Sequence, residues 1–99
     1  MENDIAIVPV YVLKLFITGA TPNSVKAINN LKTICEKHLK GRYELEIVDI
    51  YQKPLIAKAE QVIAIPMLIK MSPMPVKRLI GNMSDTQKVL KGLEIYETI

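Results

Sequence analysis

The sequence predicts a single-domain α/β fold whose first half is a βαβ unit over residues 7–50. Residues 7–18 are almost wholly apolar apart from Pro9, Lys14 and Thr18, as in a strand that is buried on both faces. The next segment, 22–40, repeats apolar side chains at helical spacing, and residues 43–50 form a second strand-like run. Ninety-nine residues suit one hydrophobic core, so we expect one domain over 1–99.

The predicted helix 22–40 has clear signals at both ends. The hydroxyl of Thr21 can cap free amides, and Pro22 falls at the first helical position, where its missing N–H costs nothing. Gly41 supplies a stop signal. The predicted buried stripe comprises Val25, Ile28, Leu31, Ile34, Cys35, His38 and Leu39.

The second half predicts a helix, a hairpin and a last helix. Residues 55–63 form a short helix candidate, whose predicted buried face is Leu55, Ala59, Val62 and Ile63. Strands over 67–71 and 75–80 are joined across residues 72–74. The last helix is expected over 84–96 with Ser84 as its cap, and its apolar face is Val89, Leu90, Leu93 and either Tyr96 or Glu97.

Composition limits the partners and the compartment. Thirteen basic and ten acidic residues give a net charge of +3, and their dispersal argues against nucleic-acid binding. The single cysteine cannot form an intramolecular disulfide and fits a reducing compartment. The apolar run 5–18 is too short to span a membrane, and the acidic start differs from a secretory signal. We therefore expect a cytoplasmic protein with no membrane partner.

No catalytic, metal or cofactor site is expected. Cys35 and His38 are three residues apart, but two ligands are too few for a metal, and the chain has no other histidine. Glu44 and Glu46 share a strand face that reads as solvent-exposed. The four glycines are isolated, so no phosphate-cradling loop is present. The chain is predicted not to be an enzyme.

The turn between the first strand and helix also excludes one activity. In thioredoxin-like folds this turn carries the redox Cys-x-x-Cys, whereas residues 19–24 here contain no cysteine. A thioredoxin-type oxidoreductase needs a low-pKa cysteine near a helix N-terminus, and Cys35 lies in mid-helix.

Several separated motifs resemble the KaiB family of circadian clock proteins. They are Lys-Leu-Phe-Ile-Thr-Gly-Ala-Thr-Pro-Asn-Ser-Val-Lys-Ala-Ile (14–28), Ala-Ile-Pro-Met-Leu (64–68), the pair Pro73 and Pro75, Lys-Arg-Leu-Ile-Gly (77–81) and Lys-Val-Leu-Lys-Gly-Leu (88–93). The resemblance covers about 13–99 without gaps. It implies a cis peptide bond before Pro66.

The resemblance also implies two alternative folds. One is thioredoxin-like, with the order βαβαββα. The other keeps the first half and rearranges the second to give βαββααβ, as the tetrameric KaiB ground state. Pro66, Pro73 and Pro75 are predicted to slow the switch, because proline isomerisation is slow. Gly92 and Glu94 are predicted to disfavour the thioredoxin-like state, since both would weaken a helix over 84–96.

Local pattern favours the thioredoxin-like order for an isolated chain. Pro73 and Pro75 suit a β connection, and each would cost around 3 kcal/mol inside a helix. The tetramer gains stability with concentration, so a concentrated sample favours the other fold.

The partners follow from the resemblance as well. It implies a regulator that binds the ATPase and kinase KaiC, and the residues expected at that interface are Lys26, Ala64, Lys70, Lys77 and Arg78. Glu44 and Glu46 stand where cyanobacterial members offer a lysine toward KaiA, which makes KaiA a doubtful partner. A KaiB–KaiC pair without KaiA, in a stress response, fits better than a full oscillator. The alternative is an adaptor that binds another partner, such as a sensor kinase.

A homo-oligomer is also expected. The apolar residues Met67, Leu68, Ile69 and Met71 would form an aggregation-prone edge if they were exposed in a monomer. A homodimer or homotetramer would cover part of that edge.

Overall fold

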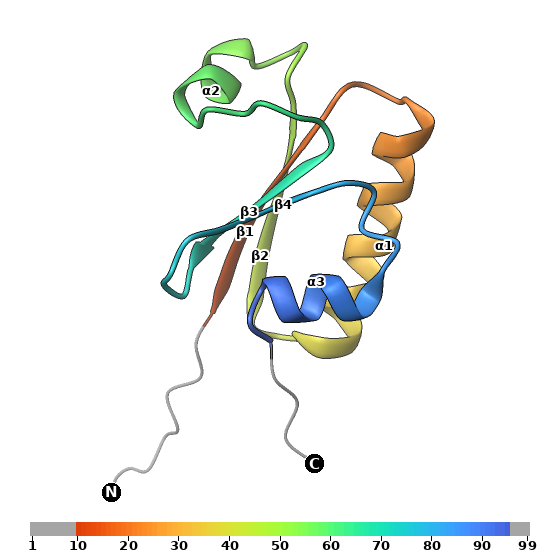
Figure 1. Cartoon of the computed structure of the whole chain (residues 1–99), viewed down its shortest axis with the longest axis vertical. Helices are drawn as coiled ribbons and strands as arrows, with labels where there is room; N and C mark the ends of the chain where they lie inside the picture. Colours follow the sequence, from red (N-terminus) through yellow and green to blue (C-terminus); the bar gives the residue numbers. More distant parts are fainter. Residues whose placement is uncertain (1–9, 96–99) are drawn as a thin grey trace, which may run out of the picture.

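The structure, a computed structural model, describes residues 10–95 and has the order βαβαββα (Figure 1). The elements are β1 (Tyr11–Ile17), α1 (Pro22–His38), β2 (Tyr43–Asp49), α2 (Pro54–Ala59), β3 (Met67–Ser72), β4 (Lys77–Ile80) and α3 (Thr86–Gly92). This is the thioredoxin-like order of the two that the sequence left open.

The strands form one mixed sheet in the order β2-β1-β3-β4. β1 and β2 are parallel, with Tyr11 opposite Tyr43, as the βαβ prediction required. β3 runs antiparallel to β1, and β4 runs antiparallel to β3. β2 and β4 are therefore the two edge strands of the sheet in the described part of the chain.

Helices cover both faces of this sheet. α1 and α3 lie on one face and α2 lies on the other, near one end of the strands (Figure 1). The larger core lies beneath α1 and α3, where Leu13, Leu15 and Leu68 pack against Leu31 and Leu93. The smaller core lies beneath α2 and is built from Phe16, Val48, Ala57, Met67 and Ile69.

The start of α1 follows the predicted signals, with one correction. Thr21 is the N-cap, its hydroxyl accepts a hydrogen bond from the Ser24 amide, and Pro22 opens the helix. Val25 is 43% exposed, so its place on the predicted buried stripe was wrong. Ser24 and Ala27 are buried at this end instead. The small Ser24 fits because its hydroxyl is hydrogen-bonded to the preceding turn.

The predicted buried face of the second helix was wrong at Leu55, Ala59 and Ile63, whereas Val62 packs against the smaller core. α2 has six residues and ends at Ala59, and Ala57 is its buried member. Leu55 is 79% exposed, and Ala59 is exposed as well. A helix of fewer than two turns has too few residues for periodicity to decide which side faces the sheet.

β3 is a central strand, which overturns the expectation that it forms an exposed edge. Met67, Leu68 and Ile69 are fully buried between β1 and β4. The proposed oligomer therefore cannot rest on the exposure of this segment in the thioredoxin-like fold.

The last helix is shorter than predicted. α3 begins at Thr86, and its N-cap is Asp85 rather than Ser84, because the Asp85 carboxylate accepts a hydrogen bond from the Lys88 amide. It ends at Gly92, so Glu94 lies beyond the helix with a φ of +58°. Tyr96 and Glu97 lie outside the described residues.

The connection after Gly92 is a Schellman motif. The Glu94 amide donates to the Lys91 carbonyl and the Ile95 amide donates to the Leu90 carbonyl, at 3.1 and 2.9 Å. The buried pair Leu90 and Ile95 supplies the hydrophobic contact that accompanies this motif. Glu94 occupies the left-handed position, where glycine is the usual residue.

Candidate partner-binding surface

The turn after β1 holds hydroxyl groups where thioredoxins hold thiols. Thr21 Oγ1 donates to Ser24 Oγ at 2.8 Å, and the Thr18 amide donates to the same oxygen at 3.1 Å. Ser24 is buried and its hydroxyl is satisfied by these contacts. This turn therefore fixes the start of α1 and contains no thiol for disulfide exchange.

Cys35 is unsuited to nucleophilic chemistry. It is fully buried in α1, and desolvation together with the neighbouring Glu36 carboxylate raises the pKa of its thiol to about 12. A thiol with this pKa is protonated at neutral pH, and the thiolate is the reactive form.

Residues 10–95 contain neither a candidate metal site nor a candidate membrane-spanning helix. No group of three or more histidine, cysteine, aspartate or glutamate side chains lies close enough to hold a metal ion. No helix in the same residues is long and apolar enough to cross a membrane.

A groove lies beside β4. It has a volume of about 500 Å³ and is lined by Gln61, Ile63, Met67, Arg78 and Ile80. We call it the β4 groove. Ile63 is 86% exposed and Ile80 is 56% exposed, which is unusual for isoleucine. The groove thus combines an apolar surface with one guanidinium group.

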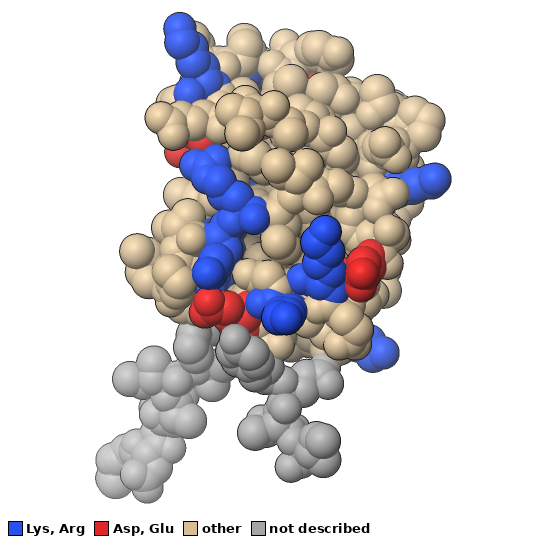
Figure 2. Space-filling view, viewed as in Figure 1, with Lys and Arg blue, Asp and Glu red and all other residues tan. Residues whose placement is uncertain are grey.

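Arg78 is the cation of this groove. It lies on β4 opposite Ile69 of β3, so its side chain stands on the face of the sheet that carries α2. In Figure 2 several cationic side chains run down the left of the molecule, on the side of α2 and the β3–β4 connection, and others lie across its lower part and at its right edge, while the upper centre of this face is uncharged. A partner that approaches this side meets positive charge next to apolar surface.

The structure separates the five residues predicted to contact a partner. Arg78 lines the β4 groove, and Ala64 is half-buried in the loop beside Ile63. Lys26 is exposed on α1, which covers the opposite face of the sheet. Lys77 points toward that same opposite face, because it alternates with Arg78 along β4.

Lys70 is not at the surface of this fold. It is 1% exposed, and its ammonium lies 5.9 Å from the centre of the Tyr11 ring. In this conformation Lys70 does not present its charge to a partner. Arg42 lies over the same ring at 5.7 Å, so two cations flank one aromatic side chain.

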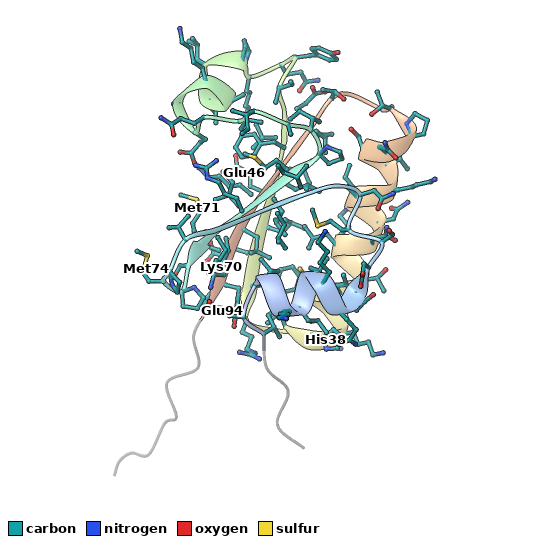
Figure 3. All side chains as sticks on the ribbon, viewed as in Figure 1. His38, Glu46, Lys70, Met71, Met74 and Glu94 are labelled. Atoms are coloured by element: carbon teal, nitrogen blue, oxygen red, sulfur yellow. The ribbon has the colours of Figure 1, made fainter. Side chains whose placement is uncertain are left out.

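Two of the predicted fold-switch residues, Gly92 and Glu94, make specific contacts in this fold. Glu94 Oε2 lies 3.5 Å from Lys77 Nζ, and the Glu94 carbonyl accepts a hydrogen bond from the Tyr11 hydroxyl. Lys70 and Glu94 lie at the same end of the sheet (Figure 3). These contacts fasten the end of α3 to β1 and β4.

Gly92 allows α3 to approach β4 closely. A Cβ at Gly92 would lie 2.5 Å from Leu79 Cδ2, 3.0 Å from Cδ1 and 3.2 Å from Cγ. The expectation that Gly92 only weakens the thioredoxin-like state was therefore incomplete, because in this state a Cβ at position 92 would have to displace the Leu79 side chain.

The three prolines of the predicted switch all follow cis peptide bonds. The bond before Pro66 is cis, as the resemblance implied, and the bonds before Pro73 and Pro75 are cis as well. Pro66 is buried directly before β3, while Pro73 and Pro75 lie in the β3–β4 connection.

The sequence pattern does not reveal the apolar members of the β4 groove. It predicts Ile63 on a buried helix face and Ile80 at the end of a strand. Nothing local in the sequence shows that the loop after α2 lies beside β4.

Taken together, these features define a thioredoxin-fold protein without the redox pair, whose exposed surface suits protein binding. The fold resembles the N-terminal domain of Synechococcus elongatus SasA, with a TM-score of 0.71 and 19% identity, covering 100% of this chain and 97% of that one. It also resembles mitochondrial thioredoxin 3 from Saccharomyces cerevisiae, with a TM-score of 0.69 and 16% identity, covering 85% and 76%.

The sequence itself identifies the family. Residues 14–95 match the KaiB domain. The circadian clock oscillator protein KaiB from Prochlorococcus marinus subsp. pastoris (strain CCMP1986 / NIES-2087 / MED4) is 46% identical over 85 residues, which cover 86% of this chain and 79% of that protein. The chain belongs to the KaiB family.

Proposed function

We propose that this protein is a non-enzymatic regulator that binds a KaiC-type ATPase in a circadian-clock or clock-derived stress-response system. The observation that carries the proposal is the KaiB domain match over 14–95, together with relatives that are circadian clock oscillator proteins. The buried, protonated Cys35 and the thiol-free turn at 19–24 support a role in binding rather than in redox catalysis.

The β4 groove is the surface that we assign to this partner. Arg78 offers a guanidinium that can pair with a carboxylate in two parallel hydrogen bonds, and Ile63 and Ile80 offer apolar contact area. Arginine beside exposed apolar side chains is typical of the residues that dominate binding energy at interfaces. Ala64 lies at the margin of this surface and Lys26 on another face, so the groove and Arg78 form the main part of the assigned surface.

KaiA is not included as a partner. Glu44 and Glu46 are exposed on β2, an edge strand, and they make this edge acidic. A partner that presents an acidic surface to this edge would meet like charges, which oppose association.

The test is a titration of the protein against the KaiC-type ATPase of the same organism, with binding measured by surface plasmon resonance. We expect specific binding that Arg78→Ala weakens about tenfold or more, because hydrogen bonds to charged groups contribute about 1.5–3 kcal/mol. Lys32→Ala is the matched control, since Lys32 is an exposed cation on α1. Absence of binding would refute the proposed function. Equal losses for both variants would refute the assignment of the groove.

A further inference from the structure

The outer edge of β4 carries backbone groups that are available for pairing. β4 pairs only with β3 within residues 10–95, and the Gly81 amide donates to the Pro66 carbonyl at 3.0 Å. In an antiparallel ladder, bonded and non-bonded pairs alternate. Counting from Gly81, Leu79 and Lys77 bond to β3, while the amides and carbonyls of Arg78 and Ile80 point outward.

The side chains of the same two residues belong to the β4 groove. Arg78 and Ile80 are exposed on the α2 face of the sheet, and Ile63 completes the exposed apolar part, while Met67 lines the groove but is itself buried. An added strand would therefore place alternate side chains beside Arg78 and then beside Ile80.

We propose that the outer edge of β4 binds an extended segment of a partner protein as a fifth strand. The segment carries an aspartate or glutamate beside Arg78 and, two residues away, an aliphatic side chain in the apolar part of the groove. Main-chain hydrogen bonds to Arg78 and Ile80 supply affinity, and the two side chains supply specificity. This proposal rests on the assignment of the β4 groove as the partner surface, and it is tested with a peptide, so its failure can be told apart from a failure to bind the KaiC-type ATPase.

Charge distinguishes this edge from its alternatives. Two β4 edges facing each other would bring Lys77 and Arg78 of both copies together, which disfavours pairing with the same edge of a second copy. The other open edge, β2, carries Glu44 and Glu46, so it repels an acidic segment. An acidic segment is thus directed to β4.

The probe is the peptide Ac-Ser-Thr-Glu-Thr-Val-Thr-Ser-NH2, titrated into dilute 15N-labelled protein and followed by NMR. We expect the Arg78 and Ile80 amides to shift downfield and to become protected from hydrogen exchange, with a dissociation constant below about 1 mM. A peptide with lysine in place of the glutamate should bind at least tenfold more weakly. Shifts confined to β2, or equal affinity for both peptides, would overturn the proposal.

A proline variant tests the backbone contact separately from the side chains. Ile80→Pro removes one outward amide without removing a bond to β3, a placement that edge strands accept. Peptide binding should fall at least tenfold, whereas Ile80→Val, which keeps the amide, should bind as the unmodified protein does. Equal binding by the two variants would refute strand addition.

Two further measurements keep the proposal testable. If Ile80→Pro does not fold, Arg78→Gln should still lower the affinity for the acidic peptide at least tenfold, without lowering that for the lysine peptide, because the repulsion between lysine and Arg78 is removed. Unchanged affinity for the acidic peptide would refute the role of Arg78. If rising protein concentration without peptide protects the Arg78 and Ile80 amides while the other signals of residues 55–95 keep their positions, the occupant is a second copy in the present fold, and the proposed partner segment is wrong.

Discussion

Gly92 shows how a single residue can have opposite effects in isolation and in the fold. In an exposed helix, alanine is favoured over glycine by roughly 1 kcal/mol. Here the added Cβ would meet three atoms of the Leu79 side chain, the nearest at 2.5 Å. The close approach of α3 to β4 therefore decides the outcome, and the helix propensity of alanine does not.

We predict that Gly92→Ala lowers the free energy of unfolding of the thioredoxin-like state by about 1 kcal/mol. Overpacking typically costs about 1–3 kcal/mol, of which the gain in helix propensity offsets part. Urea denaturation checks the value. In a Leu79→Ala background the same substitution should cost less, because the colliding atoms are gone. An equal or larger cost in that background would contradict the explanation.

At the scale of elements, the end of α3 is fastened to the sheet by Glu94. The side chain pairs with Lys77 of β4, and the carbonyl accepts the Tyr11 hydroxyl of β1. Glu94 thus supports the thioredoxin-like arrangement, although its φ of +58° is unfavourable for a residue other than glycine. The helix dipole would make Glu94 unfavourable only if this residue lay inside the last helix, and the structure places it beyond the end of α3.

We predict that Glu94→Arg destabilises this arrangement by up to about 1 kcal/mol, since it replaces a partly exposed ion pair with two like charges. Thermal unfolding at low and high salt checks this, because salt should reduce the difference. Lys77→Glu combined with Glu94→Arg should recover most of the loss. A double variant that is no more stable than the single one would show that the ion pair contributes nothing.

The parts of this fold that could be predicted are those determined by residues close together in the sequence. The stretch 14–28 contains its own strand pattern, cap residue and proline, so the first βα unit could be predicted from local signals. α2 could not, because its burial is decided by the sheet beneath it. The β4 groove was inaccessible for the same reason: Ile63 and Ile80 are seventeen positions apart and meet only through the sheet order.

At the scale of the whole molecule, we predict an equilibrium that depends on concentration. The resemblance implies a rearranged homo-oligomer, and mass action favours it as the concentration rises. Light scattering should give a mass near 11.2 kDa in dilute solution and a larger mass in concentrated solution. In NMR spectra, signals of residues 55–95 should change with the mass while those of 10–50 keep their pattern.

A mass that stays at that of the monomer up to millimolar concentration would contradict this prediction. A larger mass with unchanged signals for 55–95 would show that copies associate without rearrangement. These outcomes separate an oligomer of the present fold from the rearranged state.

The opposite charges on the two edges of the sheet also matter before any contact is made. With Glu44 and Glu46 on β2 and Arg78 on β4, the molecule carries an electrostatic gradient across its strands. A partner with a field of its own exerts a torque on such a gradient and turns the protein while the two are still diffusing toward each other. Added salt would then lower the association rate constant more than it raises the dissociation rate constant, so ionic strength would set how quickly a complex assembles.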